Sequence, residues 1–360
     1  MEFSFEGLKP PSSKPLIGML CSYTPEEILY AAGLQPVRIY GSGKVIKRGD
    51  AYLYSTLCPY VRSIFDLAFE GHLDDFKNMV FVNSCDAMRR LYDVWRHYIK
   101  NDFIHILDVP RTASEDKLNY YVQQLRDLIR RLEEELRVDI TADSLREAIR
   151  LVNHTRQLFQ ELFELRKKDD SNLWGSQIFP IMLASMSSPK ESFNQRLEQY
   201  IKEISRTEPQ PSETPRPRLL VSGSIIEQAE FIKLLEDSGA RVVAEDLCTG
   251  IRSLEGMVSE EGDPIEAIAL RYLNRPPCSR MKGVERRYQS IKHIIEEYGI
   301  HGVVYHTIKF CDPELMTYPL IRKELERENI PVLHLEGDCT MGSHGQFKTR
   351  VGAFLEMLEY

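Results

Sequence analysis

Short apolar runs followed by amphipathic helical patterns recur along the chain. The run Met79–Val82 carries no charge and therefore predicts a strand that is covered on both faces. Apolar residues then recur at helical spacing, at Met88, Leu91, Tyr92 and Trp95. Cys85 thus stands where a predicted strand ends and a predicted helix begins. In open α/β sheets this is the edge at which ligands bind.

The same pattern returns in the second half of the chain. The stretch 301–325 is again an apolar run, a Cys311–Asp312 step and a helical pattern. Further apolar runs flank both units at matching places: 16–20, 36–39 and 103–108 in the first half, and 219–223, 241–244 and 331–336 in the second. We therefore predict an α/β protein of two related Rossmann-like halves that face each other, each with a doubly wound, mostly parallel sheet.

Helical patterns without strands separate the two halves. Residues 118–136 and 141–167 carry apolar side chains at helical spacing among many Arg and Glu, which is typical of helices with one solvated face. Residues 205–218 are polar and rich in proline and predict a linker. The predicted organisation is an N-terminal α/β domain over 1–113, a helical segment over 114–204, the linker, and a C-terminal α/β domain over 219–360.

Composition narrows the classes of function. The 360 residues are 42% hydrophobic and 28% charged, as in ordinary globular proteins, and the formal net charge is -8. A negative charge argues against nucleic acid or an anionic membrane as the main partner. No apolar segment approaches the roughly 20 residues that span a bilayer, and residues 1–15 lack the features of a secretion signal. We expect a cytoplasmic protein.

The seven cysteines carry the most specific chemistry. No C-x-x-C pair occurs, and five of the cysteines directly or closely follow apolar runs: Cys21, Cys85, Cys248, Cys311 and Cys339. Cys58 and Cys278 lie in turns beside proline. Each cysteine taken alone could equally be a small core residue. Taken together, their positions predict that the cysteines lie at one site. Thiolates at well-separated strand ends suit an iron–sulfur cluster held between domains, and three cysteines also suit zinc.

Three further segments are of interest. Thr24, Pro25 and Glu27 match a helix N-cap with a capping box. Residues 41–44 (GSGK) have only a weak likeness to a phosphate loop, because the full spacing and a preceding strand are both missing. The glycine-rich, polar segment 337–350 follows a predicted strand and leads into a final helix, so we expect it to line a site.

The order of these motifs resembles the 2-hydroxyacyl-CoA dehydratase component D and benzoyl-CoA reductase family. The resemblance covers almost the whole chain. It is carried by CSYTPEE at 21–27 with Ala31–Gly33, Cys58–Pro59, Ser84–Asp86, EDLCTGIR at 245–252, Phe310–Pro313, LEGD at 335–338 and GQFKTR at 345–350.

The resemblance implies a subunit that binds an oxygen-sensitive [4Fe–4S] cluster through Cys58, Cys85 and Cys311, with Cys21, Cys248, Cys278 and Cys339 as further candidate ligands. It implies two partners, an ATP-hydrolysing iron–sulfur activator that supplies a low-potential electron, and a related subunit or second copy of this chain. The implied enzyme is a lyase of the 2-hydroxyacyl-CoA dehydratase type or an ATP-dependent reductase. It acts on an acyl-CoA thioester by a ketyl-radical mechanism.

Two alternatives stay open within the resemblance. One branch of the family holds a double-cubane [8Fe–9S] cluster with six cysteines and reduces small molecules as a homodimer. The chain lacks the additional cysteine expected between Cys58 and Cys85 in that branch, so Cys21 or Cys339 would have to substitute. The other alternative is a non-catalytic companion subunit. Some relatives carry a flavin, which nothing in the sequence supports.

Five other residues are candidates for roles near the cluster. His344 and Glu26 are candidate catalytic residues, and a histidine can transfer protons near neutral pH. The alternatives are that His344 is a loop residue without a function and that Glu26 only caps a helix. Ser22, Gln346 and Arg350 are candidate substrate-binding residues. Arg350 would meet a CoA phosphate or the thioester oxygen, with a structural ion pair as the alternative.

Overall fold

Two four-stranded parallel sheets form the framework of the computed structural model, which describes residues 14–168, 171, 173–206, 216–338 and 344–358. The first sheet has the order β2-β1-β3-β4 and the second the order β6-β5-β7-β8. Their strands are β1 (Leu16–Met19), β2 (Gln35–Arg38), β3 (Asn78–Val82), β4 (Phe103–Leu107), β5 (Arg218–Gly223), β6 (Arg241–Asp246), β7 (Gly302–Ile308) and β8 (Val332–Gly337). The two sheets share one topology, which confirms the prediction of two related α/β halves.

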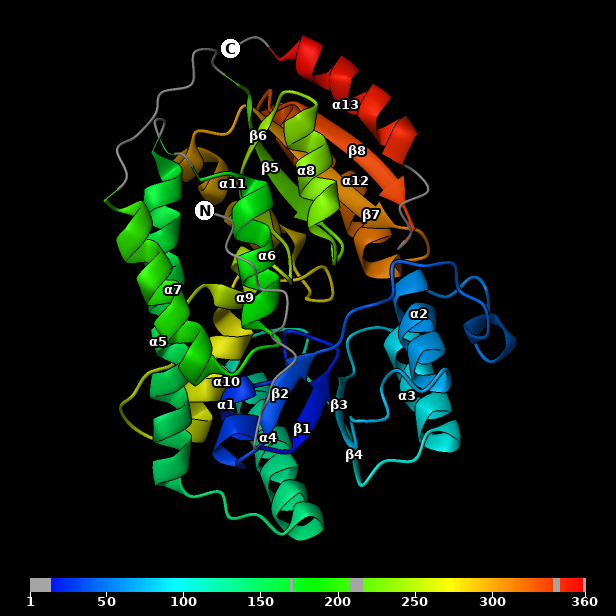
Figure 1. Cartoon of the computed structure of the whole chain (residues 1–360), viewed down its shortest axis with the longest axis vertical. Coiled ribbons are helices and arrows are strands. Elements are labelled where there is room, and N and C mark those ends of the chain that lie inside the picture. Colours follow the sequence, from blue (N-terminus) through cyan, green and yellow to red (C-terminus); the bar gives the residue numbers. More distant parts are fainter. Residues whose placement is uncertain (1–13, 169–170, 172, 207–215, 339–343, 359–360) are drawn as a thin grey trace.

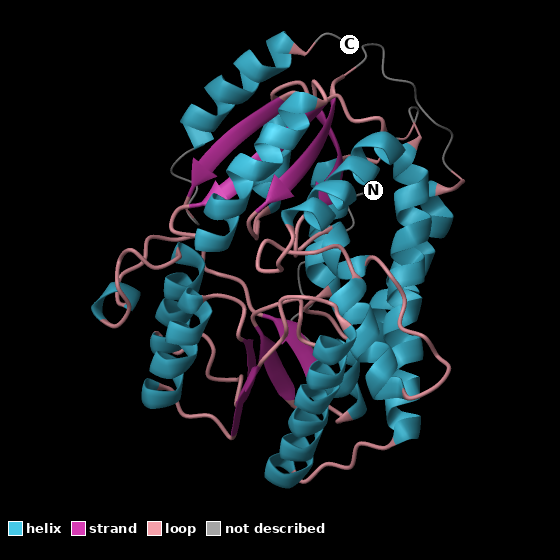
Figure 2. Ribbon diagram, turned by 180° about the vertical axis from the view of Figure 1, so that it is seen from behind, coloured by secondary structure: helices cyan, strands magenta, loops and turns pink. Residues whose placement is uncertain are grey.

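Helices surround both sheets (Figure 2). The part of the chain that links the two sheets in sequence is also helical. The N-terminal half contains α1 (Glu26–Ala31), the short 3-10 helix η1 (Gly49–Ala51), α2 (Pro59–Phe69) and α3 (Asp86–Tyr98). The intervening segment contains α4 (Glu115–Leu136), α5 (Ala142–Lys167), α6 (Gly175–Ser185) and α7 (Lys190–Ile204). The C-terminal half contains α8 (Ala229–Asp237), α9 (Ile251–Leu254), α10 (Pro264–Asn274), α11 (Val284–Tyr298), α12 (Asp312–Arg327) and α13 (His344–Met357).

Strand β3 shows why an uncharged run forms the centre of the first sheet. All five of its residues are buried. Successive side chains of a strand point to opposite faces, and here Met79 and Phe81 join the apolar cluster beneath α2 and α3, while Val80 and Val82 join the one that contains α4. Helices therefore cover both faces of the sheet, as the uncharged run predicts.

Helices α5 and α10 tie the two halves together. At 26 residues, α5 is roughly 39 Å long and runs beside both sheets (Figure 1). Its Ile149 packs in the apolar cluster of the first sheet and its Phe159 in that of the second. Tyr272 of α10 lies beyond the linker in the sequence yet packs in the cluster of the first sheet. The halves therefore share helices as well as facing each other.

The predicted start of α1 is wrong. Its N-cap is Pro25, and no side chain caps the helix. Glu27 does not form a capping box, because its carboxylate accepts hydrogen bonds from Arg156 at 2.6 Å and from Tyr272 at 2.9 Å. The buried ion pair takes precedence over the local sequence pattern.

Some predicted features fall outside the described residues. These are most of the linker (207–215), the central part of the glycine-rich segment (339–343) with Cys339, and the side chain of His344. Among the helices that are described, none has the length and apolar character needed to cross a membrane.

Candidate functional site

The carboxyl ends of the two sheets point toward the middle of the molecule, where the halves meet (Figure 1). Arg280, in the loop between α10 and α11, joins them. Its guanidinium donates to the backbone carbonyls of Asn83, Val109 and Pro110, which follow β3 and β4. Ile308, at the end of β7, packs in the apolar cluster of α2 and α3. We call this region the domain junction.

Three cysteines of the domain junction each stand directly before a helix. Cys58 is the N-cap of α2, Cys85 of α3 and Cys311 of α12, and none of the three side chains caps its helix. All three pack in or against the same apolar cluster. The positive end of each helix dipole favours negative charge at its N-terminus, so each thiol lies where a thiolate would be stabilised.

The Cys85 and Cys311 thiols have raised pKa values and stay protonated in the absence of a metal. A hydrogen bond with Cys58, together with burial, raises the pKa of Cys311 well above its usual range. Burial raises the pKa of Cys85 to about 11, and the nearby Cys311 adds to the shift. A metal bound here would displace these protons, because cysteine coordinates as a thiolate.

The remaining described cysteines lie close to this group. Cys21 follows β1 and Cys278 precedes α11, and both pack against the apolar cluster of the first sheet that contains α4 and α10. Burial raises the pKa of Cys248, which follows β6, to about 11, although Arg38 and Arg252 oppose the shift. Within the described part of the chain, no group of three or more His, Cys, Asp or Glu side chains is arranged to hold a metal ion.

A buried network of charges fixes the helix that follows Cys311. Glu314, on the first turn of α12, accepts hydrogen bonds from Tyr305 at 2.6 Å and from Arg287 at 3.4 Å. Burial alone would raise the pKa of Glu314, but the charges of Arg287 and Arg252 outweigh it and lower the pKa. Arg252 in turn pairs with Asp246 at 3.0 Å. The network holds the start of α12 in place.

Ser22 and Glu26, the predicted substrate-binding and catalytic residues of the first half, both have protein partners. Arg275 donates to the hydroxyl and to the carbonyl oxygen of Ser22, each at 2.8 Å. Glu26 pairs with Lys190 at 3.0 Å. These contacts link Ser22 to the C-terminal half and α1 to α7, and the functional roles of both side chains stay predictions.

The candidates of the last helix are differently placed. Arg350 donates to the backbone carbonyl of His334 in β8 at 2.7 Å, and both Arg350 and Gln346 are exposed. His344 begins α13, and its side chain lies outside the described residues. Arg350 thus has a backbone partner in β8, and its contact with a ligand stays a prediction.

Arg38 and Glu227 were not among the site residues that the sequence predicted. Arg38, at the end of β2, is 5% exposed, and its Nε and Nη1 have no hydrogen-bond partner among the described residues. Glu227, after β5, accepts the backbone N–H of Gly41 at 2.6 Å. The sequence did offer an indication for Arg38, because it is the only charged residue in the buried strand QPVR. No local pattern marks Glu227, because its neighbours come from the other half of the chain.

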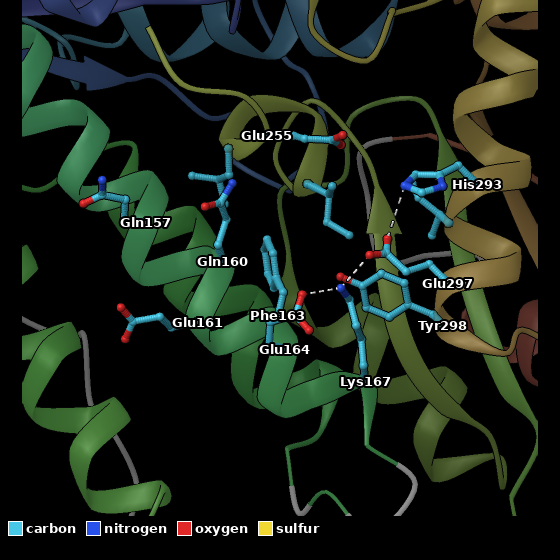
Figure 3. A pocket seen from close by; sticks show the side chains of 13 residues that line it. Gln157, Gln160, Glu161, Phe163, Glu164, Lys167, Glu255, His293, Glu297 and Tyr298 are labelled. Atoms are coloured by element: carbon cyan, nitrogen blue, oxygen red, sulfur yellow. Dashed lines mark hydrogen bonds and ion pairs between the residues drawn. The ribbon is translucent and has the colours of Figure 1, made fainter. Parts of the chain in front are cut away.

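A separate cavity of about 560 Å³ lies between α5, α9 and α11 (Figure 3). Its charged lining is mainly acidic, and its one lysine, Lys167, is paired with Glu164 and with Glu297, the latter at 2.6 Å. No cysteine lines it. A mainly acidic cavity whose lysine is already paired would bind an anionic ligand poorly. The domain junction is therefore the better candidate for the functional site.

The chain is similar to known proteins over nearly its whole length. The family model described as "2-hydroxyglutaryl-CoA dehydratase, D-component" matches residues 21–358. A benzoyl-CoA reductase subunit of Thauera aromatica is 28% identical over 96% of this chain and 92% of its own. The (R)-phenyllactyl-CoA dehydratase beta subunit of Clostridium sporogenes is 27% identical over 95% and 91%. The beta subunit of (R)-2-hydroxyglutaryl-CoA dehydratase of Acidaminococcus fermentans is 25% identical over 96% and 93%.

The family match spans both sheets, the intervening helices and all seven cysteines of the sequence. Because this match and these relatives cover nearly the whole chain, the chain belongs to the family of 2-hydroxyglutaryl-CoA dehydratase D-components, which includes subunits of benzoyl-CoA reductase.

Proposed function

We propose that Cys58, Cys85 and Cys311 hold a [4Fe–4S] cluster at the domain junction. The donor set suits such a group: three thiols from three separate helix N-termini pack in one apolar cluster. They belong to both halves, so the cluster would join the two sheets. With three cysteine ligands, one iron stays open to bind an oxygen atom of a substrate.

The proposed protein is a subunit of a 2-hydroxyacyl-CoA dehydratase or benzoyl-CoA reductase type of enzyme. The bound cluster would supply one-electron chemistry and a Lewis-acidic iron for dehydration or reduction of an acyl-CoA thioester. This chain's own residues would position the ligands and keep water away, since the thiols lie in an apolar cluster. Several relatives are named as beta subunits, which supports a partner subunit. We further propose an ATP-hydrolysing activator as electron donor and a cytoplasmic location.

The observation that carries this proposal is the grouping of Cys58 with Cys311 across the two halves. Their thiols are hydrogen-bonded although the residues are far apart in the sequence. Core packing does not require a cysteine at the N-cap of three different helices, whereas a cluster requires several cysteine thiolates from separate segments.

A double-cubane [8Fe–9S] cluster is the second candidate. The observation in its favour is that Cys21 influences the pKa of both Cys85 and Cys248, and that Cys278 also influences that of Cys248. The structure describes six cysteines, which is the number that such a cluster requires.

Iron and acid-labile sulfide per chain, measured on protein purified without oxygen, test the proposal. About four iron atoms per chain support the single cluster, and about eight support the double cubane. Absence of both would contradict either assignment. The absorption spectrum of the same sample would also reveal a flavin.

Cysteine variants separate the two clusters further. Changing Cys58, Cys85 or Cys311 to Ser is expected to abolish iron binding, whereas Cys278→Ser is the matched control because it lies outside the proposed ligand set. Full iron in Cys85→Ser or Cys311→Ser would refute the ligand assignment. Loss of half of the iron in Cys278→Ser would favour the double cubane.

A reconstitution distinguishes an enzyme from a companion subunit. The chain is assayed with activator, ATP and (R)-2-hydroxyglutaryl-CoA, alone and with a candidate partner subunit. Turnover by the chain alone would identify it as catalytic by itself. Turnover only with the partner, and retained with Cys85→Ser in this chain, would identify a companion whose own cluster is dispensable.

A further inference from the structure

A cavity of about 600 Å³ lies at the end of α3 that points away from the domain junction (Figure 1). Its walls come from the last turn of α3, from the loop between α3 and β4, and from Lys77, which directly precedes β3. The cavity is therefore at the amino ends of β3 and β4. Because α3 is 13 residues long, roughly 20 Å of helix separates the cavity from Cys85.

Three cations line this cavity, Lys77, Arg96 and Lys100. Among the described residues, none of their side chains has a hydrogen bond or an ion pair. The lining contains one carboxylate, that of Asp102, and it has no ion pair within the described part of the chain either. With His97 neutral, the lining thus carries two positive charges on a chain whose formal net charge is -8. We call it the basic cavity.

Helix electrostatics account for only part of this charge. Arg96 lies in the last turn of α3, where a cation offsets the negative end of the helix dipole. Lys77 belongs to a different segment, so the dipole does not explain its position. Exposed arginines of other helices are paired within their own helix, as Arg130 is with Glu134 on α4. A bound anion would supply the partner that the cations of the basic cavity lack.

Hydrogen bonds hold together the segments that carry these cations. The Oδ1 of Asn101 accepts from the indole N–H of Trp95 at 2.8 Å, and its Nδ2 donates to the carbonyl oxygen of Phe76 at 3.1 Å. The backbone N–H of Asp102 donates to the carbonyl oxygen of Lys77 at 2.8 Å. The loop after α3 is thus fixed against the segment before β3. Binding of an anion therefore requires little ordering of the backbone.

Apolar and aromatic side chains form other walls of the basic cavity. Tyr98, Ile99 and Ile104 line it, and Tyr98 is 50% exposed. Tyr98 and Ile99 also line an adjoining cavity of about 240 Å³, whose other walls include Ala68, Leu73, Phe76 and one carboxylate, that of Asp74. A phosphate group alone would fill a small part of this space. The walls therefore favour a ligand that has an organic body as well as an anionic group.

We propose that the basic cavity binds a phosphate monoester of an organic molecule. The phosphate group, which carries close to two negative charges at neutral pH, would lie among Lys77, Arg96 and Lys100. The organic body would pack against Tyr98 and Ile99. The inference does not depend on the iron–sulfur proposal, because none of these residues is a candidate cluster ligand.

Calorimetric titration of AMP, a phosphate monoester, into the intact, anaerobically purified chain tests this. Inorganic phosphate and adenosine are the comparison ligands. AMP should bind more tightly than inorganic phosphate, because only AMP has a body that can contact the apolar walls. Adenosine should give no measurable binding at the same concentrations. Added sodium chloride should weaken AMP binding, because the cations of the cavity are exposed to solvent.

Variants of exposed side chains locate the site without disturbing the core. Lys77→Gln and Lys100→Gln should each weaken AMP binding about two- to fivefold, and the double variant should abolish it. Asp102→Asn removes a negative charge from the lining, so it should tighten AMP binding by a similar factor. Lys323→Gln, at an exposed lysine of α12, is the matched control and should bind AMP as the unaltered chain does.

Several outcomes would overturn the proposal. The absence of AMP binding by the unaltered, folded chain would remove the site, and AMP binding that survives in the double variant would place the ligand elsewhere. An equal loss in Lys323→Gln would indicate attraction to surface charge in general. Inorganic phosphate bound as tightly as AMP would contradict the role of the organic body, and an unchanged affinity in Asp102→Asn would contradict the role of charge. Circular dichroism of each variant verifies that it is folded.

Discussion

Glu27 and Arg156 form a fully enclosed ion pair, with 2.6 Å between the carboxylate and the guanidinium and side chains that are 0% and 3% exposed. Tyr272 donates to the second carboxylate oxygen at 2.9 Å. The three residues come from α1, α5 and α10, which are distant in the sequence. One buried carboxylate therefore holds together helices of both halves.

Removal of this carboxylate should destabilise the protein strongly. Glu27→Gln leaves Arg156 as a buried charge without its partner, so we expect the free energy of unfolding to fall by about 3–5 kcal/mol. Urea denaturation followed by circular dichroism measures the change. Glu191→Gln breaks an exposed pair with Lys14 and is the control, with an expected loss of at most about 1 kcal/mol. Equal effects of the two variants would contradict this account.

Stability should depend on pH through His105 of β4. Burial, with the nearby Arg131, lowers the pKa of His105 to about 4, below its ordinary value of 6.5. Between these values the unfolded chain binds a proton that the folded chain does not. The contribution of His105 to stability is therefore lost as the pH drops from about 7 to about 4, and this contribution levels off below that value. His306 contributes in the same window, because burial also lowers its pKa to about 4.

The pH dependence is checked by urea denaturation at several pH values. His105→Gln removes one titrating group, so its stability should fall less steeply over the same range. An identical slope in the variant would show that His105 does not titrate in this window.

Gly223 ends β5 with a φ of +120°, and a Cβ there would lie 1.9 Å from the backbone oxygen of His306. Gly223→Ala therefore requires a shift of one strand against its neighbour, and we expect a loss of at least about 3 kcal/mol. Gly352→Ala, on α13 with nothing within 4 Å of the added Cβ, is the matched control and should stabilise by up to about 1 kcal/mol. Thermal unfolding compares them, and a neutral Gly223→Ala would contradict the predicted clash.

Arg280 holds the C-terminal half to the strand ends of the N-terminal half through backbone carbonyls that include those of Val109, at 2.5 Å, and Pro110, at 3.1 Å. Arg280→Met leaves these oxygens without their donor, so we expect a loss of about 2–5 kcal/mol. Hydrogen exchange should also quicken around residues 107–111. Arg126→Met, in an exposed pair with Asp263, is the control. Unchanged exchange in Arg280→Met would show that the contact is dispensable.

The strands could be predicted because their patterns are local. An uncharged run such as that of β3 is stable only when both of its faces are covered, which is the arrangement of a parallel sheet between helices. The repetition of such runs in both halves predicted the shared topology. The start of α1 could not be predicted, because a distant arginine engages the glutamate that the capping pattern requires.

Some features of the candidate site could likewise be predicted from sequence, and others could not. Cys58, Cys85 and Cys311 could be singled out because each lies before a helix and fits a family motif. The contact between Cys58 and Cys311 could not be predicted from sequence, because the two thiols belong to different halves and meet only when these pack together.

The sequence by itself determined the strands, most of the helices and the identity of the cysteines, because hydrophobic spacing and residue chemistry are properties of neighbouring positions. Only the tertiary structure decided that Cys58 meets Cys311, that Glu27 pairs with Arg156 and that, among the described residues, Arg38 is left without a full set of partners. These are relations between distant segments. Their energies depend on burial and on separation in space, and neither exists until the two halves have packed together.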